Sequence, residues 1–405
     1  MKFQKIGKQG VFLALFLIVS CQSHNAAPQM TIEQFVGCFL SPVSCVFHSP
    51  KADAIPREQW DSLACHAVRA NALTLGVFTT ILRDSSDVEY TLGYTTPSTI
   101  RTDTAYPLII YLHGGNGSPL STKGEKAYDM LLPLADTFNL FLASPSANRF
   151  APWWSPSGIG RILQTLRFMT LHYPINPDKV FLAGVSDGAT GCYVAANTIP
   201  SPFAGFIAVS GFGGMLPALG MTPIPSNIMQ RPIYNVNAGK DRIYDIAQVN
   251  KFLDWLVGQG VSVERKEYPD ELHGFDYRDK EFGTIARYIR TWSKPSDKRQ
   301  VNWTEVAGFP NCADNLIGFT PDNASPSRHI TAFWKDDTLM ISAEGLREAI
   351  VSFPDIDKET IAIRINKKQS RTIHALPGNA QLSYRLMMHS CFPIVKHSTC
   401  YRIQF

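Results

Sequence analysis

Three residue types that together perform nucleophilic catalysis occur in a suggestive order along this chain. Ser186 stands in the pentapeptide 184–188, Gly-Val-Ser-Asp-Gly, and is followed first by Asp241 and then by His273. A serine hydroxyl is a poor nucleophile unless a base removes its proton, and that base is usually a histidine oriented by a carboxylate. We therefore expect Ser186 to be a nucleophile, His273 its base and Asp241 the acid that orients the base.

The residues around Ser186 favour a sharp strand-to-helix turn. The apolar run Val180–Ala183 ends at Gly184, and a helix-compatible segment begins after Ser186. A nucleophilic serine is often mounted on such a turn, where side chains at Gly184 and Gly188 would collide with neighbouring segments. The alternative is an ordinary surface turn, because short patterns of glycine and serine also arise by chance.

The proposed acid and base each follow an expected strand. Asp241 comes after the apolar run Ile233–Val236, and Asp245 is the fallback for the acid. Asp241 could instead cap a helix or form a turn with its own backbone. His273 follows the expected strand Val261–Tyr268 and precedes a glycine; the alternative for it is a solvated loop side chain.

A second glycine-containing segment, Leu112–Gly117, is expected to bind the negative charge that forms on the substrate oxygen. Glycines let backbone N–H groups approach a substrate without an intervening side chain. We expect the N–H groups of Gly115 and Asp187 to form this oxyanion hole, and His113 to be a structural loop residue. The Asp187 carboxylate is expected to point away, because a negative charge facing the site would disfavour an anionic intermediate.

Two tryptophans, Trp153 and Trp154, follow a strand-like segment near the edge where a substrate would dock. They could line a pocket for an acyl group or a sugar. Packing of a loop onto the body of the protein accounts for them equally well.

The segments that must position these residues alternate between strands and helices. Short, continuously apolar runs indicate strands buried on both faces, hence a mostly parallel sheet covered by helices, a doubly wound α/β fold. An expected hairpin over residues 75–94 precedes this part of the chain. The expected strands are 108–112, 140–143, 180–183, 206–209 and 233–236, and the expected helices include 161–172 and 246–256.

The chain changes character near residues 293–299, which are polar and aperiodic. Beyond them, 329–334, 338–341 and 360–365 are strand-like, which predicts a C-terminal all-β domain of sandwich type. We expect four parts: a signal peptide at 1–20, an N-terminal tether and cap at 21–72, the α/β domain at 73–296 and the β domain at 297–405.

The N-terminus predicts export. Three lysines precede an apolar run too short to span a bilayer, and the run ends at Ile18–Cys21, which resembles a bacterial lipobox. We expect a cell-envelope protein anchored to the membrane surface by lipid on Cys21; the alternative is ordinary cleavage and a secreted or periplasmic protein.

Charge and cysteine content limit the other classes. Loss of the signal lowers the formal net charge from +4 to +1, leaving 35 basic against 34 acidic residues, so nothing suggests a nucleic acid as partner. No zinc-binding spacing occurs, and no metal or cofactor is expected. Cys192 is expected to pack as a small apolar residue. Six cysteines could form three disulfides, with Cys391–Cys400 the most local pair; the others are Cys38, Cys45, Cys65 and Cys312.

From about residue 75 to 290 the chain resembles exported esterases of the α/β-hydrolase fold, of the feruloyl-esterase and polyhydroxybutyrate-depolymerase-like group. The resemblance rests on Leu-His-Gly-Gly at 112–115, Asn-Pro-Asp-Lys-Val at 176–180, Ser186, Asp241 and His273. The chain departs from the usual pattern at Asp187 and at Ala189. The resemblance implies a hydrolase of small or polymer-attached carboxylic esters; the alternatives are a serine peptidase of the prolyl-oligopeptidase type and an inactive surface-anchored binding protein.

Overall fold

The computed structural model describes residues 75–376 and 399–405, apart from residues 85, 102–103, 296–298, 311, 354–355, 357 and 367. The predicted signal peptide, Cys21 and the N-terminal tether and cap lie outside the described residues. Within the described part of the chain, no helix is both long and apolar enough to cross a membrane.

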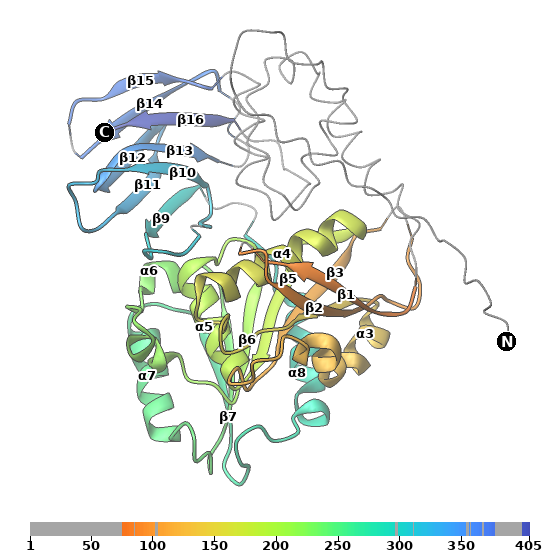
Figure 1. The fold of residues 1–405 in the computed structure, drawn as a ribbon. Coiled ribbons are helices and arrows are strands. Elements are labelled where there is room, and N and C mark those ends of the chain that lie inside the picture. Colours follow the sequence, from red (N-terminus) through yellow and green to blue (C-terminus); the bar gives the residue numbers. More distant parts are fainter. Residues whose placement is uncertain are drawn as a thin grey trace, which may run out of the picture.

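An eight-stranded sheet forms the centre of the first part (Figure 1). Its strand order is β1-β2-β4-β3-β5-β6-β7-β8; all neighbours from β4 to β8 pair in parallel, whereas β2 is antiparallel to both β1 and β4. The strands are β1 (Val77–Arg83), β2 (Glu89–Thr95), β3 (Tyr106–Leu112), β4 (Phe141–Pro145), β5 (Ile175–Val185), β6 (Gly205–Val209), β7 (Ile233–Ala238) and β8 (Val263–Tyr268). This is the doubly wound, mostly parallel sheet of the α/β-hydrolase fold, and β1 and β2 form the expected hairpin.

Helices cover both faces of this sheet, so alternate side chains of the central strands enter two separate cores. One core contains Leu108 and Ile110 of β3 with apolar residues of α4, α5 and α7. The other contains Ile109 and Tyr111 of the same strand with residues of η2, α3 and α8. The helices are η2 (Lys123–Leu131), α3 (Leu132–Phe138), α4 (Pro156–His172), α5 (Asp187–Thr198), η3 (Gly213–Met215), η4 (Pro217–Leu219), α6 (Pro225–Ile228), α7 (Ile246–Gly258) and α8 (Arg278–Thr291).

Two helices show how local chemistry sets their ends. Helix α4 begins five residues before the expected start, because the Ser155 hydroxyl accepts a hydrogen bond from Gly158 N–H and Pro156 fits the first turn. Helix α7 begins where predicted. Its cap is Asp245, whose carboxylate accepts a hydrogen bond from Gln248 N–H at 3.1 Å. Asp245, the fallback for the catalytic acid, is therefore used as a helix cap.

The C-terminal strands form a β-sandwich. A three-stranded sheet, β10-β13-β16, and a five-stranded sheet, β15-β14-β12-β11-β9, enclose one apolar core that includes Trp303, Ile341, Val351 and Tyr401. The strands are β9 (Gln300–Thr304), β10 (Leu316–Pro321), β11 (His329–Lys335), β12 (Thr338–Glu344), β13 (Leu346–Ser352), β14 (Thr360–Ile365), β15 (Arg371–His374) and β16 (Cys400–Gln404).

The sandwich attaches to the α/β part beside α6, just before β7 (Figure 1). The Asn227 side chain donates to Thr304 O at 2.8 Å and accepts from Thr304 N–H at 3.0 Å. Arg231, fully buried, donates to both carboxylate oxygens of Asp314 at 2.6 Å. Both Asn227 and Arg231 precede β7, so the join lies at the amino end of the parallel strands.

The cysteines differ in part from expectation. Cys192 is buried in α5 as a free thiol, as predicted, and burial raises its pKa well above the ordinary value. Cys400 is also a buried free thiol, so the structure does not support a Cys391–Cys400 disulfide, the most local of the possible pairs. Its expected partner Cys391 lies outside the described residues, as do Cys38, Cys45 and Cys65.

Candidate active site

Ser186 occupies the sharp turn between β5 and α5 that the sequence predicts. Its backbone has φ +55° and ψ −119°, a region that a residue with a side chain rarely adopts. The flanking glycines make the turn possible. A Cβ on Gly188 would lie 2.0 Å from the carbonyl oxygen of Leu112, and one on Gly184 would lie 2.5 Å from the carbonyl of Gly188. The close contacts that require both glycines therefore hold Ser186 at the carboxyl end of the sheet.

The structure joins Ser186, His273 and Asp241 in one hydrogen-bonded chain. His273 Nε2 lies 2.8 Å from Ser186 Oγ, and His273 Nδ1 lies 2.7 Å from Asp241 Oδ2. The side chain of Asp241 is fully buried, whereas that of His273 is 18% exposed. The imidazole thus bridges a buried carboxylate and a serine hydroxyl that solvent can approach, as a base serving that hydroxyl requires.

The turn carrying Asp241 is fixed from two sides. The second carboxylate oxygen, Oδ1, accepts hydrogen bonds from the N–H groups of Ile243 at 2.8 Å and Tyr244 at 2.9 Å. The predicted turn with its own backbone and the contact with His273 therefore occur together. Each carboxylate oxygen has its own partner, so Asp241 Oδ2 is held in place for the imidazole.

The loop of His273 is held against the same turn. Gly239 N–H donates to Tyr268 O at 2.7 Å, and Lys240 N–H donates to Glu271 O at 3.0 Å. These bonds join the segment after β7 to the segment after β8. Because both strands are parallel neighbours, their carboxyl ends bring the acid and the base together even though 32 positions separate them in the sequence.

Two residues around the imidazole were not found by sequence reasoning. Gly274 N–H donates to the hydroxyl of the buried Ser210 at 3.2 Å, and the rings of His273 and Tyr244 pack edge to face, with centroids 5.6 Å apart. These contacts fix the ring orientation that an exposed loop histidine would otherwise lack. The sequence carried no signal for Ser210, and the one available signal for Tyr244 was its place three residues after Asp241.

The glycine loop after β3 lies beside the serine. A Cβ on Gly114 would lie 3.0 Å from Ser186 Cβ, and Gly115 has φ +68°, in the left-handed region that favours glycine. Gly114 O lies 2.9 Å from His113 Nδ1. In a trans peptide the next N–H points the opposite way, so Gly115 N–H is directed away from the imidazole of His113. Asp187, whose N–H is the second predicted donor, is the first residue of α5.

His113 supports this loop as a neutral residue. Its Nε2 accepts a hydrogen bond from Ala147 N–H at 3.0 Å, so the ring proton resides on Nδ1 and is donated to Gly114 O. Burial lowers the pKa of His113 to about 4, which keeps the imidazole uncharged near neutral pH. This is the structural role that the sequence predicts for His113.

Both tryptophans pack against the body of the protein, which was one of the two expected alternatives. Trp153 is fully buried; its indole N–H donates to His113 O at 2.9 Å, and its ring meets the His113 ring edge-on at 5.3 Å. Trp154 is partly buried and packs against the same core. Trp153 therefore supports the glycine loop from beneath.

We expected the Asp187 carboxylate to point away from the site, but it points into the glycine loop. Its Oδ2 accepts a hydrogen bond from Asn116 N–H at 2.7 Å, within the glycine loop. On the other side of the same peptide bond, Lys123 Nζ donates to Gly115 O at 2.6 Å. Sequence reasoning missed Lys123, which lies eight residues after Gly115 in a segment without a clear period.

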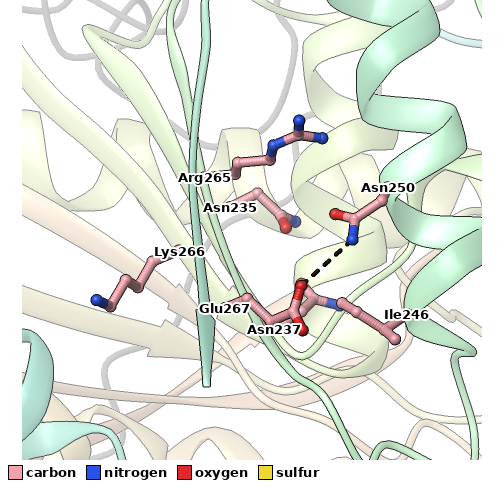
Figure 2. Close-up of a pocket in the computed structure, with 7 residues that line it drawn as sticks. All are labelled: Asn235, Asn237, Ile246, Asn250, Arg265, Lys266 and Glu267. Carbon is pink, nitrogen blue, oxygen red and sulfur yellow. Dashed lines mark hydrogen bonds between the residues drawn. The ribbon is translucent and has the colours of Figure 1, made fainter. Parts of the chain in front are cut away.

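A separate polar cavity of about 290 Å³ lies between α7 and strands β7 and β8 (Figure 2). Ser186, Asp241 and His273 are not among the residues that line it, so it is distinct from the candidate site. Figure 2 shows Asn250 directed toward Glu267. Asn250 Nδ2 donates to Glu267 Oε2 at 3.3 Å. The lining residues are Asn235, Asn237, Ile246, Asn250, Arg265, Lys266 and Glu267.

Among the residues that the structure describes, no cluster of three or more histidine, cysteine, aspartate or glutamate side chains could hold a metal ion.

Comparisons with known proteins give structural matches over part of the chain. No protein-family model and no curated protein matches the sequence. A thermostable esterase aligns with 54% of this chain and 63% of its own length, at 18% identity and a TM-score of 0.46. The serine hydrolase FphF of Staphylococcus aureus aligns over 53% of this chain and 98% of its own, at 15% identity and a TM-score of 0.44.

An acylaminoacyl peptidase of Pyrococcus horikoshii aligns over 56% of this chain and 44% of its own, at 14% identity and a TM-score of 0.44. The present chain thus covers less than two thirds of the thermostable esterase and less than half of the peptidase.

Proposed function

We propose that this protein is a serine hydrolase that cleaves carboxylic esters through an acyl-enzyme. The single observation that carries the proposal is the continuous chain from Ser186 Oγ through His273 to the buried Asp241, with links of 2.8 and 2.7 Å. Acyl transfer by a serine requires a positioned hydroxyl, a base within hydrogen-bonding distance of it and an acid that orients the base. Ser186, His273 and Asp241 have these three positions.

The proposed reaction has two halves. Ser186 Oγ attacks the ester carbonyl while its proton passes to His273 Nε2, and the charge that forms on the carbonyl oxygen is bound by the N–H groups of Gly115 and Asp187. His273 then gives the proton to the departing alcohol, which leaves an acyl group on Ser186. Water, deprotonated by His273, attacks the acyl carbonyl; the carboxylic acid departs and Ser186 recovers its proton. Asp241 stabilises the imidazolium in both halves.

The proposal is tested with short-chain p-nitrophenyl esters and a fluorophosphonate probe. The unmutated protein should turn over the esters and bind the probe covalently, and Ser186→Ala should do neither. Cys192→Ala is a matched control, since this buried residue of α5 has no place in the reaction. A wild-type protein without turnover and without labelling would overturn the proposal; turnover of amides far above that of esters would favour a peptidase.

We further infer that the protein acts at the cell envelope, anchored to the membrane surface through lipid on Cys21. The support is the sequence alone: three lysines, a short apolar run and the lipobox-like end at Cys21. Metabolic labelling with a palmitate analogue tests this. Wild-type protein should carry the label and Cys21→Ser should not, whereas an unlabelled wild-type protein would favour ordinary cleavage and a secreted or periplasmic location.

A further inference from the structure

Asp187 and Lys123 hold opposite ends of one peptide bond beside the candidate nucleophile. The Asp187 carboxylate accepts from Asn116 N–H at 2.7 Å, and the Lys123 ammonium donates to Gly115 O at 2.6 Å. A peptide unit has a dipole with its positive end at N–H and its negative end at C=O. A carboxylate at the first end and an ammonium at the second both favour the same orientation of the Gly115–Asn116 peptide.

Among the described residues, Gly115 O and Asn116 N–H have no other hydrogen-bond partner. The side chain of Asn116 is buried, and neither its amide oxygen nor its amide nitrogen has a hydrogen-bond partner among the described residues. Gly115 has no side chain and a positive φ, so its backbone has wide conformational freedom. The bonds to Asp187 and Lys123 therefore have a large share in fixing the peptide.

The preceding peptide bond is fixed in the same manner by His113, which donates to Gly114 O. With the peptides on both sides of Gly115 held, its N–H has one direction, away from the imidazole of His113. The loop that carries it packs closely against Ser186 at Gly114. An oxyanion donor is effective only when it is oriented before the charge forms.

We propose that Asp187 and Lys123 are positioning residues for oxyanion binding, which rests on the function proposed above. Asp187 then has two tasks: its backbone N–H is one donor, and its carboxylate orients the loop that carries the other donor, Gly115. Its negative charge lies in the first turn of α5, where the helix dipole favours it, and Lys123 supplies a compensating positive charge at the far end of the peptide.

This arrangement explains an acidic residue directly after the nucleophile. A carboxylate there opposes a nearby oxyanion by charge. The hydrogen bond to Asn116 N–H directs the Asp187 carboxylate into the loop. The repulsion between this carboxylate and the oxyanion is offset by the better orientation of the Gly115 N–H. Asparagine at 187 would keep an acceptor oxygen without the charge, whereas alanine would remove both.

The test compares Asp187→Ala with Asp187→Asn, and Lys123→Met with Lys126→Met. Lys126 is an exposed lysine in the same 3-10 helix, so its replacement removes the same charge as a matched control. Ester turnover is measured per active site, counted by covalent labelling with the fluorophosphonate. Loss of an oriented oxyanion donor is a transition-state effect, so Asp187→Ala should lower kcat by roughly 10- to 100-fold with little change in KM.

Asp187→Asn should recover most of that loss, Lys123→Met should lower kcat by roughly 3- to 10-fold, and Lys126→Met should stay within about 2-fold of the wild type. Asp187→Ala with a wild-type kcat per labelled site would overturn the proposal. So would equal losses in the alanine and asparagine variants, since the retained acceptor would then have no effect.

A second measurement separates this proposal from the hydrolase assignment. Deuterium uptake by the peptide that contains Asn116 is followed by mass spectrometry, which needs no turnover. Uptake should rise in Asp187→Ala and not in Asp187→Asn. If the wild-type protein cleaves no ester, the proposed function fails, and the uptake result still decides whether Asp187 holds the loop; unchanged uptake in Asp187→Ala overturns that role.

Discussion

Neutral His113 makes the stability of this protein fall as the solution becomes acidic. The ring is buried, donates from Nδ1 to Gly114 O and accepts at Nε2 from Ala147 N–H. A proton on Nε2 would remove that acceptor and place a charge at a buried position. Burial accordingly lowers the pKa of His113 from the ordinary 6.5 to about 4.

The size of the effect follows from this shift. Above pH 6.5 the histidine is neutral in the folded and the unfolded chain, and His113 adds no pH dependence. Between pH 6.5 and pH 4 the unfolded chain binds a proton that the folded chain does not, so the free energy of unfolding falls with pH. At about 1.4 kcal/mol per pKa unit, the loss reaches about 3 kcal/mol at pH 4.

The assay is urea unfolding at a series of pH values between 7 and 4, followed by tryptophan fluorescence. Other groups also titrate in this range, so the informative quantity is the difference between the wild type and His113→Gln. Glutamine offers an acceptor to Ala147 N–H but does not titrate. The wild type should lose about 3 kcal/mol more than this variant over the range.

His374→Gln, at an exposed strand position in the β-sandwich, is the matched control and should follow the wild-type curve. Parallel curves for the wild type and His113→Gln would refute the reasoning, because they would mean that His113 binds its proton equally well in the folded and the unfolded chain.

Three further results are expected. Asp241→Asn should lower kcat for esters by about 10³- to 10⁴-fold while the protein stays folded, because the imidazole loses its orienting charge; a smaller loss in steady-state assays would remove Asp241 from the triad. Asp314→Ala should lower the free energy of unfolding by about 3 kcal/mol in urea titrations, because it leaves the charge of buried Arg231 without its carboxylate; no change would mean that the pair is neutral to stability. Gly188→Ala should abolish ester turnover because its Cβ would lie 2.0 Å from a backbone oxygen, whereas Gly160→Ala, in open space within α4, should raise stability by about 1 kcal/mol; an active Gly188→Ala would contradict the tight turn.

The residues whose place is set by strand order could be predicted from the sequence. The apolar runs before Ser186 and Asp241, and the strand-like segment before His273, mark three parallel strands, and parallel strands end at one edge of a sheet. The order along the chain therefore indicated which residues would meet. The glycines at 184 and 188 likewise have a local cause, the lack of room for a side chain.

The residues that support these three side chains depend on loop conformation, which has no period to detect. Lys123 reaches Gly115 from a 3-10 helix, and Ser210 reaches the loop of His273 from the end of a different strand. The direction of the Asp187 carboxylate was predicted wrongly for the same reason. Charge repulsion alone suggested that the carboxylate points away. The Asn116 N–H that it accepts a hydrogen bond from is far from it in the sequence and becomes a neighbour only in the folded chain.

The β-sandwich joins the α/β part far from the candidate site, which affects how mutations in one part act on the other. The join, through Arg231 and Asn227, lies before β7, and the candidate site lies after the carboxyl ends of the strands. A strand of six residues, the length of β7, separates the two ends by about 20 Å. We therefore expect substitutions in the loops around Ser186 to leave the join intact. Directed evolution of the site and exchange of the sandwich are independent engineering problems in this protein.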